Sequence, residues 1–378
     1  MRQLWVDRLK ALTIFLVVWG HLMSCDAFVT DYGNACYMFI GSFHMPLFAV
    51  LSGWWFSVGR GDFGTYLRKK SIALMLPYVV WGFLWFFCVP GLKLVFSGEE
   101  IHPSTLVWLG RYFAVDGLCH YGWWFLRALF FCFLVAWVSV RLCKGRYDIA
   151  GVGSCLLLYG LCFAGIIPNM ASKDDLLKGF VFLYPFFWTG FAFHRLESRL
   201  TASWRWLLPS ALLTFAVLFS FWDGYSGFYS MNTSAIATSG VGDVIGWEVV
   251  GRTIYRYLTG TVASLAFLLI GQRFFRRDSD TETVVGESGD ARTKSLSDSL
   301  VIFVDTVGRN TLGIYILQSL VFWSLPAKLL PGWGEVGNFI FSFALSIVVT
   351  VVASIIVSFT ARYRIPALLL WGRTKSRM

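Results

Sequence analysis

Histidines inside long apolar stretches are the first residues of this 378-residue chain to suggest chemistry. His21 and His44 both lie in such stretches. Imidazole is the side chain best suited to take a proton from a hydroxyl near neutral pH. An ionisable group in hydrocarbon costs roughly 3 kcal/mol or more, so it usually faces a cavity or a partner. Both histidines are therefore candidate catalytic residues.

Each histidine also has a structural explanation. His21 could make a hydrogen bond between helices, as histidines often do in membrane bundles. The ring of His44 could serve only to satisfy carbonyls that Pro46 leaves without an amide donor. Both roles stay open for His44, whereas the depth of His21 favours a chemical role.

Three polar side chains from separate segments are expected at one level of the membrane. His21 follows Lys10 on one helix and lies about 16 Å above it at 1.5 Å per residue. By the same rise, His44 lies about 10 Å down its helix from the opposite surface, and Gln318 about 13 Å up a third helix. In a hydrocarbon core about 30 Å thick these depths are similar. They predict a site where the three meet.

Other polar residues are candidates with plain alternatives. Arg127 could reach the membrane interface or bind an anionic group in a cavity. Arg252 and Arg256 lie four residues apart on one helical face, which suits a carboxylate or pyrophosphate, and pairing with Glu248 is the alternative. The hydroxyl of Ser52 has no base visibly paired with it. The eight cysteines show no metal-ligand spacing, so no metal site is predicted.

The composition shows which elements must position these residues. Hydrophobic residues are 57% and charged residues 14%, with 36 Phe, 18 Trp and 15 Tyr. A soluble domain carries about 25% charge, so these values exclude an ordinary cytosolic enzyme, a coiled coil and a disordered chain. We predict an all-α, polytopic transmembrane helical bundle. Its ten apolar runs lie near residues 11–29, 37–57, 71–92, 122–140, 149–167, 180–194, 207–222, 249–271, 311–325 and 337–360.

The net charge of +10 is distributed as a topology signal. Basic residues recur in small groups between alternate apolar runs, and loops rich in Lys and Arg mark the cytoplasmic side. This pattern predicts about ten spans with both termini in the cytoplasm. It also argues against a nucleic-acid partner, because the cations form no single patch.

The chain is expected to form one membrane domain over residues 1–378. Residues 278–300 are acidic and polar, and we interpret them as a flexible cytoplasmic linker. Asp298–Asn310 is predicted to be a short amphipathic helix at the inner surface. A disulfide among Cys25, Cys36 and Cys119 stays open.

Four stretches, in this order and across nearly the whole chain, resemble the acyltransferase 3 family of integral membrane O-acyltransferases, particularly its sugar and polysaccharide O-acetylase branch. They are a basic residue followed after ten residues by histidine (Lys10 and His21), Phe43-His44-Met45-Pro46-Leu47-Phe48 with Ser52-Gly53, Trp124-Phe125-Leu126 with Ala128-Leu129, and Gly308 to Leu317. Lys10 stands where many relatives carry Arg, and Gln318 stands where many place His. Gln cannot cycle a proton, so Gln318 is not assigned acid–base work.

The resemblance implies transfer of an acyl group, usually acetyl, from cytoplasmic acyl-CoA to a hydroxyl of a glycan or lipid-linked saccharide. Acyl-CoA would be a co-substrate, and no bound cofactor is expected. His21 would be the base, and His44 and Ser52 would act on the acceptor or on the thioester carbonyl. Further acceptor or oxyanion candidates are Arg127, Arg252, Arg256 and Gln318. The CoA phosphates would be held by Arg8, Lys10, Arg68, Lys69 and Lys70, although the last three also fit the positive-inside rule alone.

Two other classes of protein remain as alternatives. A transporter or flippase of an amphiphilic glycan-lipid would explain the spans, but we find no inverted repeat between the two halves. A sensory or binding membrane domain would not need a basic nitrogen at the depth of His21. The expected location is the bacterial cytoplasmic membrane, with the lipid bilayer itself as a partner.

Overall fold

A computed structural model describes residues 3–23, 31–59, 61–84, 123–163, 179–222, 247–275, 296–324 and 334–374. All regular secondary structure in these ranges is helical, which confirms the predicted all-α class. Its elements are α1 Leu4–Met23, α2 Asp31–Gly41, α3 His44–Trp54, α4 Phe63–Lys70, the π-helix η1 Ser71–Met75, α8 Trp124–Leu142, α9 Tyr147–Phe163, α10 Phe180–Arg195, α11 Glu197–Ala202, α12 Trp204–Ser220, α14 Trp247–Ile270, the π-helix η3 Gly271–Phe275, α16 Leu296–Arg309, α17 Thr311–Ser324, α18 Gly334–Thr360 and α19 Arg364–Trp371.

Every predicted apolar run is mainly helical where the structure describes it, with short non-helical breaks such as residues 42–43 and 55–57 in the second run. By length and hydropathy, four helices of the described ranges can cross a membrane: Ala35–Trp54, Trp124–Leu142, Val250–Phe275 and Gly334–Thr360. Ser299–Arg309 and Thr311–Val321 pass the same test as a pair bent by 79°. Several membrane-spanning helices are thus present, while the number ten and the cytoplasmic termini stay predictions.

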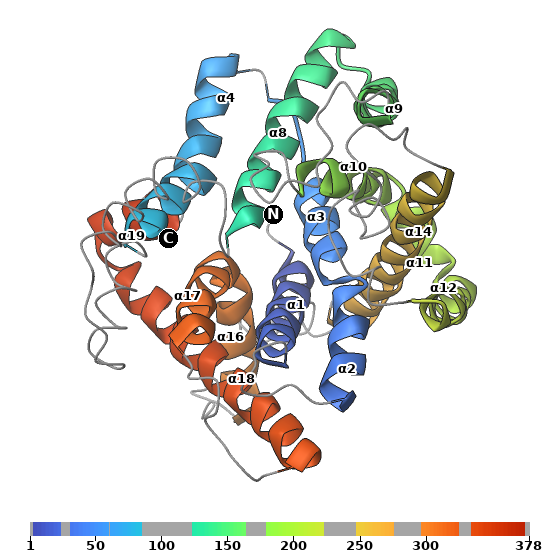
Figure 1. Ribbon diagram of the computed structural model, residues 1–378. Coiled ribbons are helices and arrows are strands. Elements are labelled where there is room, and N and C mark those ends of the chain that lie inside the picture. Colours follow the sequence, from blue (N-terminus) through green and yellow to red (C-terminus); the bar gives the residue numbers. More distant parts are fainter. Residues whose placement is uncertain are drawn as a thin grey trace, which may run out of the picture.

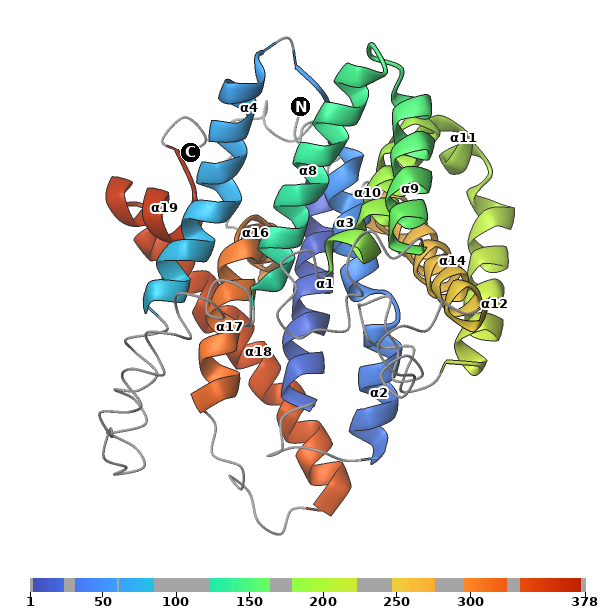
Figure 2. The same ribbon diagram turned by 45° about the horizontal axis from the view of Figure 1, so that its top comes forward.

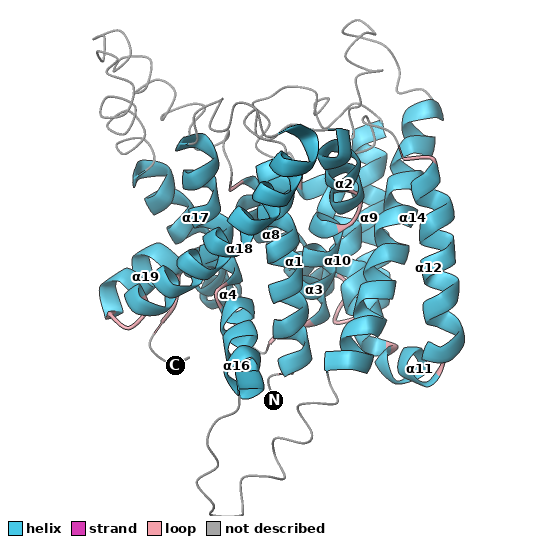
Figure 3. Ribbon diagram, turned by 90° about the horizontal axis from the view of Figure 1, so that it is seen from below, coloured by secondary structure: helices cyan, strands magenta, loops and turns pink. Residues whose placement is uncertain are grey.

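Helix α1 lies at the centre of the bundle, where α16, α17 and α18 pack on one side of it and α2 and α3 on another (Figure 1). Helix α10 packs against α3, and α12 with α14 forms the far edge (Figure 2). Figure 3 shows that α1 begins on the same side of the bundle as α11 and the start of α16. His21, His44 and Gln318 therefore lie on α1 or on helices that pack against it, whereas Arg127 lies on α8 and Arg252 and Arg256 on α14.

Glycines set how closely α3 and α10 approach. A Cβ at Gly53 would collide with the backbone oxygen of Phe187, and one at Gly190 with that of Val50. The two backbones are therefore in direct contact, as small residues allow in membrane bundles. This packing holds the C-terminal end of α3 against the C-terminal half of α10.

The predicted cytoplasmic linker ends, and the predicted amphipathic helix begins, at a different residue from the one expected. Helix α16 begins at Leu296, so the last five residues of the predicted linker 278–300 are helical, and the rest lie outside the described residues. The helix expected at Asp298–Asn310 corresponds to α16, which ends at Arg309.

Candidate active site and polar cavity

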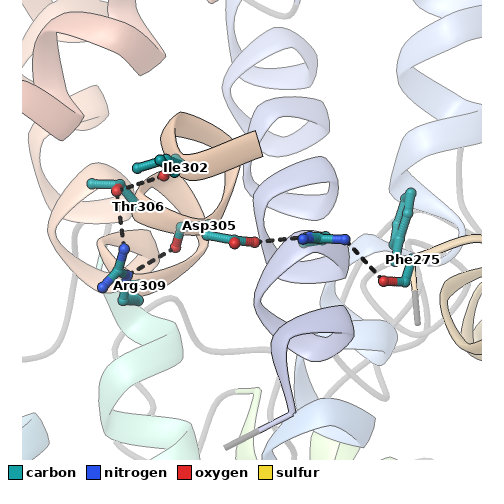
Figure 4. A network of polar contacts seen from close by, with 6 residues as sticks. Phe275, Ile302, Asp305, Thr306 and Arg309 are labelled. Carbon is teal, nitrogen blue, oxygen red and sulfur yellow. Dashed lines mark hydrogen bonds and ion pairs between the residues drawn. The ribbon is translucent and has the colours of Figure 1, made fainter. Parts of the chain in front are cut away.

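A buried ion pair joins the start of α1 to α16. The Nε of Arg8 donates to Oδ1 of Asp305 at 3.0 Å, and its Nη1 donates to the carbonyl of Phe275 at 3.0 Å. Figure 4 shows this network continuing to Arg309, whose Nε donates to the Asp305 carbonyl at 3.2 Å. Arg8 and Asp305 are both buried, so their attraction is little screened by water.

The bend between α16 and α17 is held by a second set of polar contacts. Asn310 donates through Nδ2 to Oγ of Ser358 at 2.7 Å, and Arg373 donates to Oδ1 of Asn310 at 2.9 Å. Gly308 has no side chain where the backbone of Asp7 touches α16, because a Cβ there would collide with the Asp7 carbonyl. Gly308 and Asn310 of the late-chain stretch therefore each have a structural role. The glycine lets the backbone of α1 approach α16, and the asparagine holds the bend.

These contacts surround a polar cavity of about 860 Å³ at the end of the bundle where α1 begins. We call it the polar cavity. Its lining comes from α1, the ends of α3, α16 and α18, and the chain after α19. Its cationic members are Lys10, Arg309, Arg362 and Arg373, and its other members include Gln3, Asp7, Trp55, Thr306, Asn310, Ser358 and Thr374. Guanidinium groups and an ammonium group in one cavity suit a ligand with several phosphates.

The predicted phosphate ligands divide between two places. Lys10 lines the polar cavity, but Arg68, Lys69 and Lys70 do not. The ammonium group of Lys70 instead lies over the ring of Phe133, 3.2 Å from its centroid. This places it where α4 packs against α8. Arg68 and Lys69 are exposed to the surroundings of the bundle. Arg8 is used in the ion pair with Asp305.

Sequence reasoning missed three of the cavity's cations. Arg309, Arg362 and Arg373 are not among the predicted phosphate ligands. In a sequence, a cation that ends an apolar helix looks the same whether it faces lipid headgroups or a cavity. The position of Arg309 between Gly308 and Asn310 of the late-chain stretch is the signal that the sequence offers.

His21 lies near the C-terminal end of α1, and His44 begins α3, which packs against α1. Nδ1 of His44 lies 2.7 Å from the Ile40 carbonyl, which can only accept, so this nitrogen carries the hydrogen and Nε2 keeps a lone pair. The side chain of Ile40 packs beside Gly20, the residue before His21. The two imidazoles are close enough to interact electrostatically. The hydrogen bond satisfies the Ile40 carbonyl at the end of α2, whereas Pro46 would leave the carbonyl of Ser42, four residues earlier, without a donor, so the contact differs from the structural explanation proposed for His44.

The remaining signature stretches pack against one another. Trp123 donates from Nε1 to the Ile316 carbonyl at 3.2 Å, and the rings of Phe125 and Tyr315 lie 5.9 Å apart. The same Phe125 ring lies 5.9 Å from that of Phe48 in α3. The early, middle and late stretches thus form one packed unit.

Gln318 and Arg127 lie within that unit. Both side chains are buried, at 2% exposure each. No described residue donates a hydrogen bond to Oε1 of Gln318. Burial of Arg127 argues against the membrane-interface interpretation, while Arg127 lines neither of the two described cavities. An amide oxygen buried without a donor is costly, so it suits a site that a ligand completes.

Three other candidates are placed less favourably. The Ser52 hydroxyl donates to the Phe48 carbonyl of its own helix at 2.8 Å, which gives it no base to activate it. Arg256 is buried on α14 and Arg252, one turn away, is partly buried. The side chain of Glu248, their alternative partner, lies outside the described residues, as do Cys25 and Cys119.

Comparison with protein families gives one result. The model described as an acyltransferase domain, that of the acyltransferase 3 family, matches residues 3–359. The match contains all four signature stretches and the helices that line the polar cavity up to the end of α18. Searches of curated proteins and of solved structures gave no match.

Proposed function

The chain belongs to the acyltransferase 3 family, and on that premise we propose that it moves an acetyl or other acyl group from cytoplasmic acyl-CoA to a hydroxyl of a cell-surface glycan or its lipid-linked precursor. Family membership makes it a membrane acyltransferase in general terms. The donor, the acceptor and the residue roles below are the proposal.

The polar cavity is the observation that carries the proposal. Acyl-CoA is a polyanion with a long neutral arm that ends in the thioester. Lys10, Arg309, Arg362 and Arg373 supply the charge for its phosphates. Lys10 and His21 lie on the same face of α1, about 16 Å apart along the helix axis. The arm would therefore extend along α1 from the cavity toward the two histidines.

His21 is proposed as the general base. The acceptor oxygen attacks the thioester carbonyl carbon, the new carbon–oxygen bond forms, and the carbon–sulfur bond breaks. His21 takes the hydroxyl proton and returns it to the departing thiolate of CoA. A positioned imidazole contributes typically 10²–10⁴-fold to such a proton transfer.

Three further buried side chains are proposed for the rest of the step. His44 would offer Nε2 to the acceptor hydroxyl, because its Nδ1 is occupied by Ile40. Gln318 would orient the acceptor through its amide, and Arg127 would stabilise the negative charge that develops on the thioester oxygen. Preorganised donors of this kind are usually the largest single contribution to catalysis.

Transfer of radiolabelled acetyl from acetyl-CoA in membranes tests the proposal. Wild-type membranes with the host's glycans should acquire an alkali-labile ester, and His21→Ala membranes with equal protein content should not. Label in both would remove His21 from the mechanism. No label in either, and no acetyl-CoA hydrolysis by wild type, would overturn acyl transfer from CoA.

A further inference from the structure

We propose that Trp55 is the adenine-stacking residue of the polar cavity, so that one wall of the cavity recognises the nucleotide end of acyl-CoA. This inference rests on the proposed function and adds a specificity-determining residue to it. The base would lie on the exposed face of the indole, and the neighbouring Arg362 would hold the adjacent phosphates.

Trp55 is placed as a platform. It directly follows α3, lines the polar cavity and is 44% exposed. The indole also contacts the imidazole of His194 in α10, with ring centroids 5.5 Å apart and the ring planes inclined by 42°. The indole is thus supported by the protein, and its exposed part is accessible from the cavity.

The support behind Trp55 is itself fixed. The His194 ring also contacts Trp54 at a tilt of 52°, with ring centroids 5.0 Å apart, and Trp54 makes an edge contact with Trp5 at 5.5 Å. Nδ1 of His194 lies 3.5 Å from Oε2 of Glu197, and Gln272 donates to the other carboxylate oxygen at 3.4 Å. An aromatic side chain ordered before binding loses little entropy when a base stacks on it.

Backbone packing explains why the platform stays in place. Gly53 and Gly190 let α3 and α10 touch two residues before Trp55 and four before His194. A side chain at either glycine would force the helices apart and separate Trp55 from His194. The platform is therefore a consequence of the same packing that holds the end of α3.

The surroundings of Trp55 distinguish it from a tryptophan that anchors a helix at the membrane surface. Interfacial tryptophans are common and face lipid headgroups. Trp206 on α12 is of that kind, since it is 83% exposed and lines neither described cavity. Trp55 instead shares its cavity with Lys10, Arg309, Arg362 and Arg373. An aromatic face beside several cations is the arrangement that binds a base and its phosphates.

Truncated donors test the inference. Acetyl-pantetheine keeps the thioester and arm of acetyl-CoA but lacks the nucleotide. We expect Trp55→Ala to raise the ratio of the KM for acetyl-CoA to that for acetyl-pantetheine about tenfold, within the range of a lost base–aromatic stack. Trp55→Phe should keep most of the wild-type ratio, and Trp206→Ala is the matched control that should keep all of it.

Inhibition by adenosine 3′,5′-bisphosphate provides a second measurement that does not need turnover of acetyl-pantetheine. This nucleotide should compete with acetyl-CoA in the wild type about tenfold better than in Trp55→Ala. An unchanged inhibition constant, or an equal loss for both donors, would overturn the stacking role. These results differ from failure of the proposed function, in which wild type would use neither donor.

Discussion

The polar cavity and an apolar groove on the opposite flank of the bundle are similar in size and opposite in chemistry. The groove has a volume of about 740 Å³ and lies between α9, α10 and α14, whereas the polar cavity has about 860 Å³. The groove is lined mainly by aliphatic and aromatic side chains, including Val152, Leu156, Tyr159, Trp188, Ile254 and Tyr257. The volumes therefore do not distinguish the two cavities as candidates for the proposed donor site, whereas the charges of their lining residues do.

The difference arises from which parts of the helices form each wall. The polar cavity is built from helix ends, where cations and chain turns gather. The groove runs along α9, α10 and α14 and includes Tyr147, Asp148 and Arg195 at helix ends, and two of its hydroxyls bond each other, with Thr189 Oγ1 and Tyr257 OH 2.6 Å apart. Its cation Arg195 lies 5.9 Å from the centroid of the Phe191 ring. The groove thus suits hydrocarbon, and a polyanion would find one cation there instead of four.

The largest expected effect is on the rate of acetyl transfer, and it compares His21 on the proposed donor route with Tyr257 in the groove. His21→Ala should lower acetyl transfer at saturating acetyl-CoA by about 10²–10⁴-fold, because it removes the proposed base. Tyr257→Phe, which removes a hydroxyl from the groove, should leave the rate within about twofold. Initial rates of ester formation in membranes with matched protein levels measure both. A rate loss of similar size in the two variants would contradict the assignment of catalysis to His21 and not to the groove.

The next effect concerns stability. Asp305→Ala leaves the Arg8 guanidinium buried without its carboxylate, which typically costs about 3–5 kcal/mol. The thermal midpoint of the purified protein in detergent should therefore fall markedly. Asp148→Asn at the rim of the groove is the matched control, since Asp148 is exposed, and its midpoint should hardly move. Equal midpoints for Asp305→Ala and wild type would mean that the ion pair does not hold α16 against α1.

Arg8 also shows where prediction from sequence stops. Hydropathy and charge predicted the helices well, because a membrane leaves few other ways to satisfy the backbone. The same charge pattern placed Arg8 among phosphate ligands, yet its partner Asp305 is 297 residues away and could not be inferred from spacing. Arg362 and Arg373 were missed for the same reason. Their neighbours in the cavity come from distant segments. The predicted grouping of His21, His44 and Gln318, by contrast, required only the depth of each residue in the membrane.

A moderate effect is expected from a single cavity cation. Arg362→Gln should raise the KM for acetyl-CoA about fivefold to thirtyfold, since a charge-assisted phosphate contact typically contributes roughly 1–2 kcal/mol. Added salt should weaken wild-type binding more than that of the variant, because the variant has one fewer charge to screen. Arg195→Gln makes the same change at the groove. Steady-state kinetics at two salt concentrations would contradict the assignment if Arg195→Gln produced the larger KM increase.

The smallest expected effect is the most demanding test of the comparison. Leu156 lines the groove and is 69% exposed, so Leu156→Trp narrows the groove without disturbing the packed interior. Both KM and kcat for acetyl-CoA should stay within about twofold, because no charged part of the donor has reason to enter the groove. If transfer to a lipid-linked acceptor fell while transfer to a water-soluble sugar did not, the groove would be an acceptor path. The two regions would then be the two substrate sites of one enzyme, and the mainly apolar lining of the groove would provide the recognition of a hydrocarbon tail.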